Sequence, residues 1–304
     1  MTQNLNSIVR ANGRAPHEIR VIDFFVDALG YASASILFSQ GNTKVLASVT
    51  LQQGLPHFLK GQPVGWLSAE YAMLPCATHQ RSNRESSQAQ RNARSVEISR
   101  LIGRCLRNCI DLTRLRDKTV QIDCDVLQAD GGTRVACITA ASLALEIAAN
   151  RWFEEKITDT NVFTQRIAAI SVGNVDNILV TDLDYLEDNR AEADFNFVIT
   201  QDNKLVEVQG TAEKTPLDWE QFDAAKALAQ ESTKQIFDIS SKKLASLDLH
   251  AHTSNENIIA LLSTGQARQR VSRAQNVPQD SKRQAHDGNQ KTGPFTLGNR
   301  LSKS

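Results

Sequence analysis

IDCDVLQADGGTR, residues 122–134, joins the end of a strand, a pair of glycines and the start of a helix. The pattern over 120–127 predicts the strand, and the alanine-rich run over 135–153 predicts a helix that begins at about Thr133. Glycine adopts backbone conformations that are closed to other residues. The free N–H groups of the helix's first turn, with the Thr133 hydroxyl and the Arg134 guanidinium beside them, could therefore bind a phosphate or an oxyanion. An ordinary glycine turn with a threonine cap fits the same residues.

The other segments predict helices placed between runs of strands. Strands are predicted at 32–37, 43–50, 167–172, 177–183, 195–200 and 205–209, and helices at 95–110 and 218–237. The first of these helices carries an apolar stripe that includes Cys105 and Cys109, so both cysteines are predicted to be buried. Because the elements show no strict β-α-β alternation, the predicted fold class is α+β rather than a doubly wound parallel sheet.

The composition excludes several classes of protein. Of 304 residues 41% are hydrophobic, and 34 Lys and Arg balance 34 Asp and Glu, so the net charge indicates no polyanionic partner. The sequence contains no apolar run of the roughly 18 residues that a membrane span needs, and its first residues lack the apolar stretch of a signal peptide. The glycine pair matches neither a GxGxxG nor a Walker A motif, which argues against dinucleotide-binding and NTP-driven proteins. Five cysteines without a CxxC pair favour a reducing, cytoplasmic location.

The composition shifts near residue 240 and suggests a division of the chain. We expect a folded domain over 1–240 and a basic, disordered tail over 241–304, where large apolar residues are sparse. From Lys242 onward ten Lys or Arg stand against four Asp or Glu, a local charge of +6. The tail could be a solvated extension or an auxiliary RNA-binding arm.

A basic segment precedes the first predicted helix. Arg81, Arg84, Arg91 and Arg94 lie among Asn, Gln and Ser residues, without large apolar neighbours. Guanidinium groups match phosphate oxygens, so such a segment could follow a phosphodiester backbone. A solvated loop would have the same composition.

An acidic segment, DLDYLEDNRAEAD over 182–194, separates two predicted strands. If it folds back as a turn, Asp188 and Asp194 could meet and hold a hard cation such as Mg²⁺. The same residues could simply be exposed acids of a turn, and Asp182 and Asp184 are assigned no catalytic role. Together, the predicted phosphate-binding turn at 131–134, the basic segment and the acidic pair indicate phosphoryl transfer on a nucleic acid.

The chain also resembles the ribonuclease PH family, the phosphate-dependent 3′ exoribonucleases related to polynucleotide phosphorylase and to exosome ring subunits. The resemblance runs collinearly from about residue 8 to 238. It is carried by RANGRAP (10–16), GNTKVLASV (41–49), FLKGQPVGWLSAEYAMLP (58–75), RSVEISRLIGRCLR (94–107), IDCDVLQADGGTR (122–134), DLDYLEDNRAEADFNFV (182–198) and EVQGTAE (207–213).

The resemblance implies a duplicated β-α fold, with helices packed on mixed sheets, and a homo-hexamer built as a trimer of dimers. It implies phosphorolytic trimming of tRNA precursors from the 3′ end, which releases nucleoside 5′-diphosphates, with inorganic phosphate as co-substrate and Mg²⁺ as cofactor. The site residues that follow are Arg94, Gly132, Thr133 and Arg134 for phosphate, Asp188 and Asp194 for catalysis and Mg²⁺, and Arg81 and Arg84, with Arg91 of the same basic segment, for RNA.

The chain departs from the family pattern in the basic segment. Cys76 stands where the family usually has arginine, and Gln88 and Gln90 stand at positions that are commonly basic. These changes concern RNA affinity and ring contacts rather than the chemistry. A general RNA phosphorylase and a non-catalytic RNA-binding ring subunit therefore remain alternatives to a tRNA-trimming enzyme.

Overall fold

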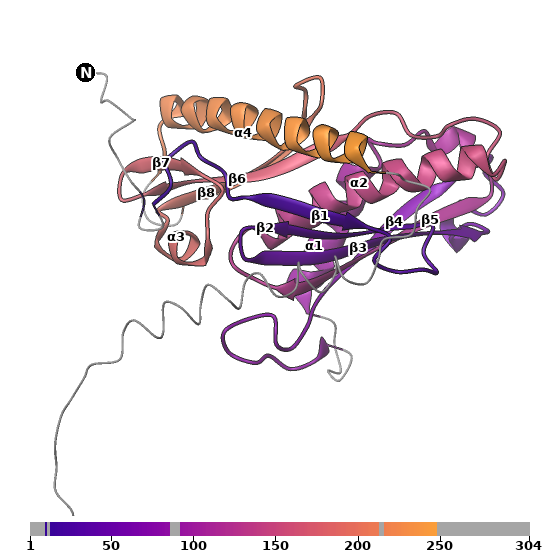
Figure 1. Cartoon of the computed structure of the whole chain (residues 1–304), viewed down its shortest axis with the longest axis horizontal. Coiled ribbons are helices and arrows are strands. Elements are labelled where there is room, and N and C mark those ends of the chain that lie inside the picture. Colours follow the sequence, from indigo (N-terminus) through magenta and orange to yellow (C-terminus); the bar gives the residue numbers. More distant parts are fainter. Residues whose placement is uncertain (1–9, 11–12, 86–91, 213–215, 248–304) are drawn as a thin grey trace, which may run out of the picture. The chain divides into compact units, whose positions relative to one another are not determined.

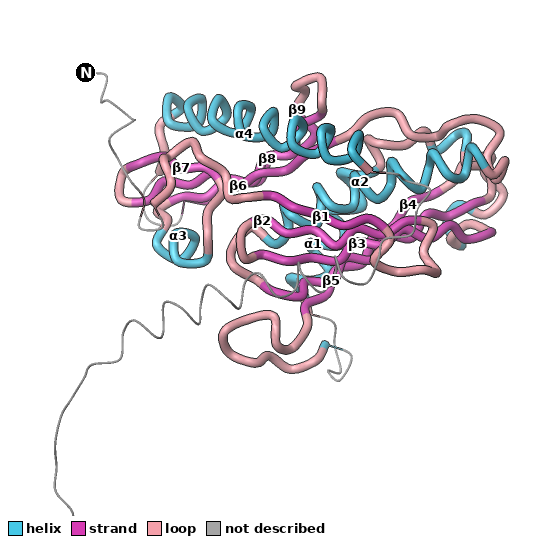
Figure 2. The backbone as a smooth tube through the Cα atoms, in the orientation of Figure 1, coloured by secondary structure: helices cyan, strands magenta, loops and turns pink. Residues whose placement is uncertain are grey.

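The computed structural model describes residues 10, 13–85, 92–212 and 216–247. Over these residues the chain forms two β-sheets and four α-helices, as Figures 1 and 2 show. The strands are β1 (Ile22–Val26), β2 (Ala34–Gln40), β3 (Thr43–Gln53), β4 (Trp66–Met73), β5 (Lys118–Gln128), β6 (Ile167–Val175), β7 (Ile178–Thr181), β8 (Ala193–Thr200) and β9 (Leu205–Ala212). The helices are α1 (Ala93–Leu106), α2 (Thr133–Glu154), α3 (Tyr185–Arg190) and α4 (Trp219–Ser246), with short 3₁₀ turns at His57–Leu59 and Leu112–Arg114.

The first sheet has the strand order β1-β2-β3-β5-β4, and the second has β7-β6-β8-β9. The second sheet is antiparallel throughout, whereas β4 pairs with β5 in parallel and makes the first sheet mixed. A two-residue turn at Gly41 and Asn42 joins β2 to β3, the strands that correspond to those predicted at 32–37 and 43–50. The α+β class predicted from the sequence is confirmed.

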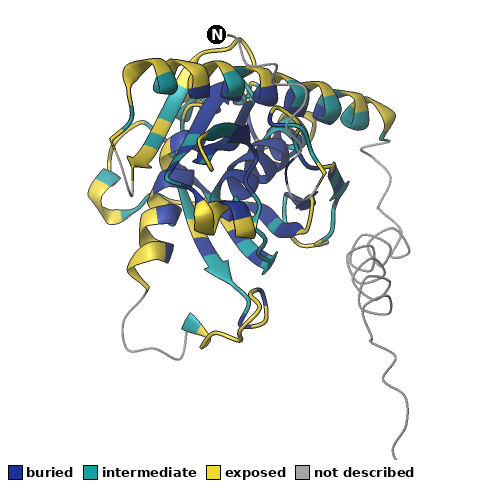
Figure 3. Cartoon of the chain, turned by 90° about the vertical axis from the view of Figure 1, so that its left-hand side faces the viewer, coloured by how far each residue is buried: buried dark blue, intermediate teal, exposed yellow. Residues whose placement is uncertain are grey.

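Helix α2 lies between the two sheets and forms the centre of the core. It packs against β2 and β3 on one side and against β6 on the other. Most of its residues are buried, including Trp152 at 2% exposure, because the helix is apolar around its circumference. Figure 3 shows the buried residues gathered inside, with the exposed face of α4 outside. This arrangement places the N-terminus of α2 at the junction of the two sheets.

Helix α1 covers β4, and α4 covers β6, β7 and β8. The stripe predicted for α1 is buried, and Cys105 and Cys109 are both fully buried free thiols, as expected. Burial raises the pKa of the Cys109 thiol to about 12, so this cysteine stays neutral. Of the helices in the described ranges, none combines the length and the apolar character that a membrane span requires.

Helix α4 ends later than the sequence predicts. The predicted end was Phe237, but the helix continues to Ser246, past the proposed domain boundary at residue 240. Tertiary contacts explain the extension, because Leu244 packs against the core and Lys243 forms an ion pair with Asp23 of β1. The expected tail beyond this helix, over 248–304, lies outside the described residues.

Candidate active site

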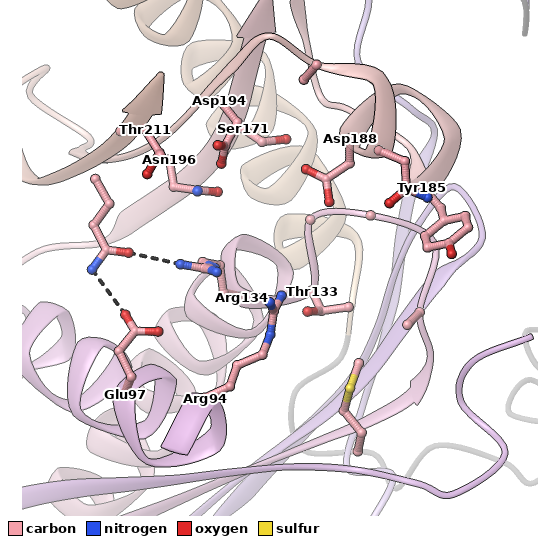
Figure 4. Close-up of a pocket in the computed structure, with 18 of the residues that line it drawn as sticks. Arg94, Glu97, Thr133, Arg134, Ser171, Tyr185, Asp188, Asp194, Asn196 and Thr211 are labelled. Atoms are coloured by element: carbon pink, nitrogen blue, oxygen red, sulfur yellow. Dashed lines mark hydrogen bonds between the residues drawn. The ribbon is translucent and has the colours of Figure 1, made fainter. Parts of the chain in front are cut away.

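A cavity of about 1000 Å³ lies where the N-terminus of α2 meets the second sheet (Figure 4). Its lining includes six residues that the sequence and the resemblance single out: Arg94, Gly132, Thr133, Arg134, Asp188 and Asp194. They come from α1, from the glycine turn and the first turn of α2, from α3 and from β8, so the fold assembles them from four separate parts of the chain. The juxtaposition of the glycine turn with the acidic segment is therefore a property of the structure and not of spacing in the sequence.

The glycine turn holds the N-terminus of α2 open toward the cavity. Gly131 and Gly132 have φ values of +75° and +65°, a region that favours glycine. A Cβ on Gly131 would lie 2.5 Å from the carbonyl oxygen of Leu183 and 2.6 Å from the carbonyl carbon of Asp184. The turn is therefore in direct contact with the backbone that leads into α3, and a side chain at Gly131 has no room.

Arginines from two helices face the cavity. The backbone N–H of Arg94 donates to the side chain of Asn92, which caps α1 and so places Arg94 in the first helical turn. Arg134 donates to the Gln209 side chain at 3.1 Å, and Gln209 in turn donates to Glu97 at 3.4 Å. Figure 4 shows both guanidinium groups directed into the same space. Two cations beside a helix N-terminus form an anion-binding site.

Thr133 contributes a hydroxyl whose position is set by a neighbour. The Thr133 hydroxyl oxygen lies 2.9 Å from the Tyr71 hydroxyl oxygen, and this hydrogen bond is buried. Burial raises the pKa of the Tyr71 phenol, which keeps it neutral and able to hydrogen-bond the threonine.

Carboxylates occupy the opposite wall of the cavity. Asp188 lies on α3, and Asp194 lies on β8, where it pairs with Gly173 and Thr211 of the adjacent strands. The side chains of β8 alternate, so Phe195 is buried while Asp194 and Asn196 line the cavity. The acidic pair predicted from the sequence is thus brought to one cavity, although by a helix and a strand rather than by a simple turn.

A buried ion-pair network ties the two walls together. Asp182 is completely buried and accepts hydrogen bonds from the backbone and side chain of Arg20. Arg20 also donates to the carbonyl oxygens of Asp130 at 2.6 Å and of Gly131 at 3.4 Å. Burial would raise the pKa of Asp182, but Arg20, with Arg14, holds it below its ordinary value. One arginine therefore positions the glycine turn against the segment that carries Asp188.

A second arginine before β1, Arg10, anchors α3 directly. Arg10 forms a buried ion pair with Glu187, and its guanidinium donates to the carbonyl oxygen of Thr181 at 2.8 Å. Asp184 caps α3 in a capping box with Glu187. The expectation that Asp182 and Asp184 have no catalytic role stays untested, but neither is an idle surface acid.

Two of the other predicted arginines, Arg81 and Arg84, are described by the structure and lie outside the cavity lining. Both are exposed in the loop after β4, and Arg91 lies outside the described residues. Sequence reasoning missed several polar lining residues, namely Glu97, Ser171, Asn196, Gln209 and Thr211. The polar–apolar alternation of the β8 sequence was the signal that could have found Asn196.

Comparison with known proteins identifies the family. The model of the 3′ exoribonuclease family matches the chain in two parts, domain 1 over residues 18–149 and domain 2 over residues 165–232. The chain belongs to this family. Ribonuclease PH of Tropheryma whipplei (strain Twist) is 46% identical over 242 residues, which cover 80% of this chain and 97% of that protein.

Solved structures agree with the fold. Rice (Oryza sativa) Rrp46 superposes with a TM-score of 0.63 at 18% identity, and covers 77% of this chain and 100% of its own. The Archaeoglobus fulgidus exosome with RNA bound to the active site gives a TM-score of 0.65 at 21% identity, over 77% of this chain and 93% of its own. The duplicated β-α fold expected from the resemblance is therefore confirmed, and the family model divides it into two domains, over residues 18–149 and 165–232. The chain is a phosphorolytic 3′ exoribonuclease that uses inorganic phosphate as co-substrate, as the resemblance implied.

Proposed function

We propose that the protein trims the 3′ ends of tRNA precursors, removing one nucleotide at a time as a nucleoside 5′-diphosphate. The observation that carries this proposal is the single cavity with arginines and a helix N-terminus on one wall and two carboxylates on the other. Anion-binding groups suit the attacking phosphate, and the carboxylates suit a metal ion at the scissile phosphodiester.

The proposed division of labour follows from the chemistry of each group. Inorganic phosphate is already an anionic nucleophile near neutral pH, so the reaction needs no residue to activate water. Arg94 and Arg134, with the N-terminal N–H groups of α2 and the Thr133 hydroxyl, would hold phosphate in line with the last phosphodiester bond. An oxygen of inorganic phosphate forms a new bond to the phosphorus, which gives the nucleoside diphosphate. The bond from that phosphorus to the 3′ oxygen of the preceding nucleotide breaks, and the 3′ oxygen takes up a proton from solvent.

Asp188 and Asp194 are the residues that would hold Mg²⁺. Over the described ranges no cluster of three or more His, Cys, Asp or Glu side chains is placed to hold a metal ion. A pair of carboxylates nevertheless fits Mg²⁺, which keeps several waters and binds through one or two carboxylates plus substrate phosphates. When bound, the ion would offset negative charge on the scissile phosphoryl group.

RNA contacts, assembly and location complete the proposal. Arg81 and Arg84 are exposed on one loop, as RNA-binding arginines should be, and Arg91 belongs to the same basic segment. We further propose a homo-hexamer built as a trimer of dimers, which native mass spectrometry would test. All five cysteines are free thiols, in keeping with the cytoplasmic location that the sequence predicts.

The decisive experiment is incubation with a tRNA that carries extra 3′ nucleotides, with and without phosphate. Nucleoside diphosphates that appear only with phosphate, and stop at the mature end, support the proposal. Degradation that continues through the tRNA body would indicate a general RNA phosphorylase. RNA binding without any product would indicate a non-catalytic subunit.

A further inference from the structure

The active-site cavity is polar over most of its lining but has one aromatic residue at its rim. Among the described lining residues Tyr185 is the single aromatic side chain, and it is 42% exposed. Figure 4 shows its ring beside Asp188, on the far side of the cavity from Thr211. The side chain of Met73 lines the cavity as well and adds a polarizable apolar surface. A ligand with both phosphates and flat rings would satisfy the two parts of such a cavity.

The backbone holds the Tyr185 ring next to the catalytic wall. Tyr185 and Asp188 are three residues apart on α3, so their side chains share one face of the helix. The helix itself is anchored by the Asp184 capping box and by the buried pair of Arg10 with Glu187. The ring is therefore presented at a fixed place relative to the Asp188 carboxylate.

A second aromatic ring lies next to Tyr185 and belongs to the loop after β4 that carries Arg81 and Arg84. The His79 ring lies 5.4 Å from that of Tyr185, centroid to centroid, with the planes tilted by 54°. His79 is exposed and precedes Arg81 and Arg84 in the loop after β4. His79 therefore joins the Tyr185 ring to the loop that carries the two proposed RNA-binding arginines.

We propose that Tyr185, backed by His79, stacks on one of the last two nucleobases at the RNA 3′ end. The proposal rests on the RNA-processing function proposed above and adds the subsite that holds the base. Every nucleobase has a flat π-face, so stacking tolerates any sequence. Such a contact suits an exonuclease that removes whichever nucleotide comes last, since hydrogen bonds to base edges would favour particular bases.

The first test measures binding without phosphate, so that no turnover can occur. The probes are short RNAs with the fluorescent base 2-aminopurine at the last or at the penultimate position. The wild-type protein and Tyr185→Phe should quench one probe on binding, whereas Tyr185→Leu should not and should bind RNA about 5- to 150-fold more weakly. Leu186→Ala is the matched control, because Leu186 is 68% exposed on the same helix and does not line the cavity.

The second test asks whether the loss depends on the base. Two further RNAs lack the last base or the penultimate base. For one of them the affinities of the wild-type protein and of Tyr185→Leu should be equal, because the base that would stack on Tyr185 is absent. In turnover, Tyr185→Leu should raise KM for RNA much more than it lowers kcat. The same affinity loss on intact RNA and on both abasic RNAs, or quenching that survives in Tyr185→Leu, would overturn the inference. Base-dependent quenching in a protein that releases no nucleoside diphosphate would instead overturn the proposed function and leave the stacking intact.

Discussion

Replacing Gly131 by alanine should damage both stability and activity, because the new methyl group has no space. The Cβ would lie 2.5 and 2.6 Å from backbone atoms of Leu183 and Asp184, and these atoms cannot move as the end of a flexible side chain can. A left-handed backbone costs an alanine about 1–2 kcal/mol. Overpacking adds about 1–3 kcal/mol, and the lower entropy of the unfolded chain offsets about 0.4–1 kcal/mol. The expected net loss is about 1–5 kcal/mol, with a central value of about 3 kcal/mol.

The matched control for this variant is Gly54→Ala. Gly54 also has a positive φ, +94°, but no atom lies within 4 Å of its added Cβ, so only the backbone cost of about 1 kcal/mol remains. The difference between the unfolding free energies of the two variants in urea gives the cost of the steric clash at Gly131. A phosphorolysis assay then measures how much activity is lost when the segment that carries Asp188 is displaced. The reasoning is refuted if Gly131→Ala is as stable and as active as Gly54→Ala.

The remaining predictions concern the phosphate site, the acids, a buried carboxylate and the tail. Arg94→Ala should lower phosphorolysis at limiting phosphate ten- to over a hundredfold, since a guanidinium–phosphate contact contributes about 1.5–3 kcal/mol; unchanged phosphate dependence would contradict its role. Asp188→Asn and Asp194→Asn should each abolish most turnover while RNA binding persists or tightens, as a filter-binding assay would show; normal Mg²⁺-dependent rates in both would exclude the metal site. The pKa of Asp182 is lower in the folded state, so its contribution to stability is present above the ordinary carboxyl pKa and is lost as pH falls below it; denaturation between pH 7 and pH 3 should show this loss, with a flatter profile in Asp182→Asn. Deleting 248–304 should leave turnover at saturating RNA intact. If the tail contacts RNA, its deletion should reduce the slope of log affinity against log salt concentration by about 0.7 for each lost phosphate contact.

The deletion in the last prediction is placed after the end of α4 for a structural reason. A cut at residue 241 would follow the composition of the sequence, but it would remove Lys243 and Leu244 from a helix that packs on the core. Aggregation of a chain cut there would report damage to α4 and would say nothing about the tail. Loss of turnover after deletion of 248–304, by contrast, would show that these residues are needed for the fold or the site.

Long periodic segments were the part of the fold that the sequence predicted best. Strand β5 and helix α2 appear within about two residues of their predicted bounds, because an apolar run of this length has few other ways to be buried. Strands β1 and β4 were not predicted, and α3 was expected to be a turn. The missed signal for α3 was local, since Asp184 followed three residues later by Glu187 is a capping-box pattern.

The connections between the site residues could not be read from the sequence. Arg20 and Asp182 are 162 residues apart, and no periodicity links them. Nor does any sequence pattern assign a role to Arg10, whose partner Glu187 is 177 residues away. Such pairs form only after two sheets have packed on one helix, so they belong to tertiary structure. The arginine, threonine and aspartate residues that line the cavity were easier to predict from the sequence, because these residue types have recognisable chemistry.

Arg20 has a consequence for judging which relatives of this chain are active. It does not line the cavity, yet it holds the carbonyl groups of the glycine turn and the buried Asp182 at the same time. A relative could therefore keep every cavity-lining residue and still lose catalysis through one substitution near its N-terminus. Conversely, an N-terminal fusion or truncation close to this segment would disturb the reaction centre from outside. The set of residues that a working enzyme of this family requires thus includes one that precedes the first strand, outside the cavity.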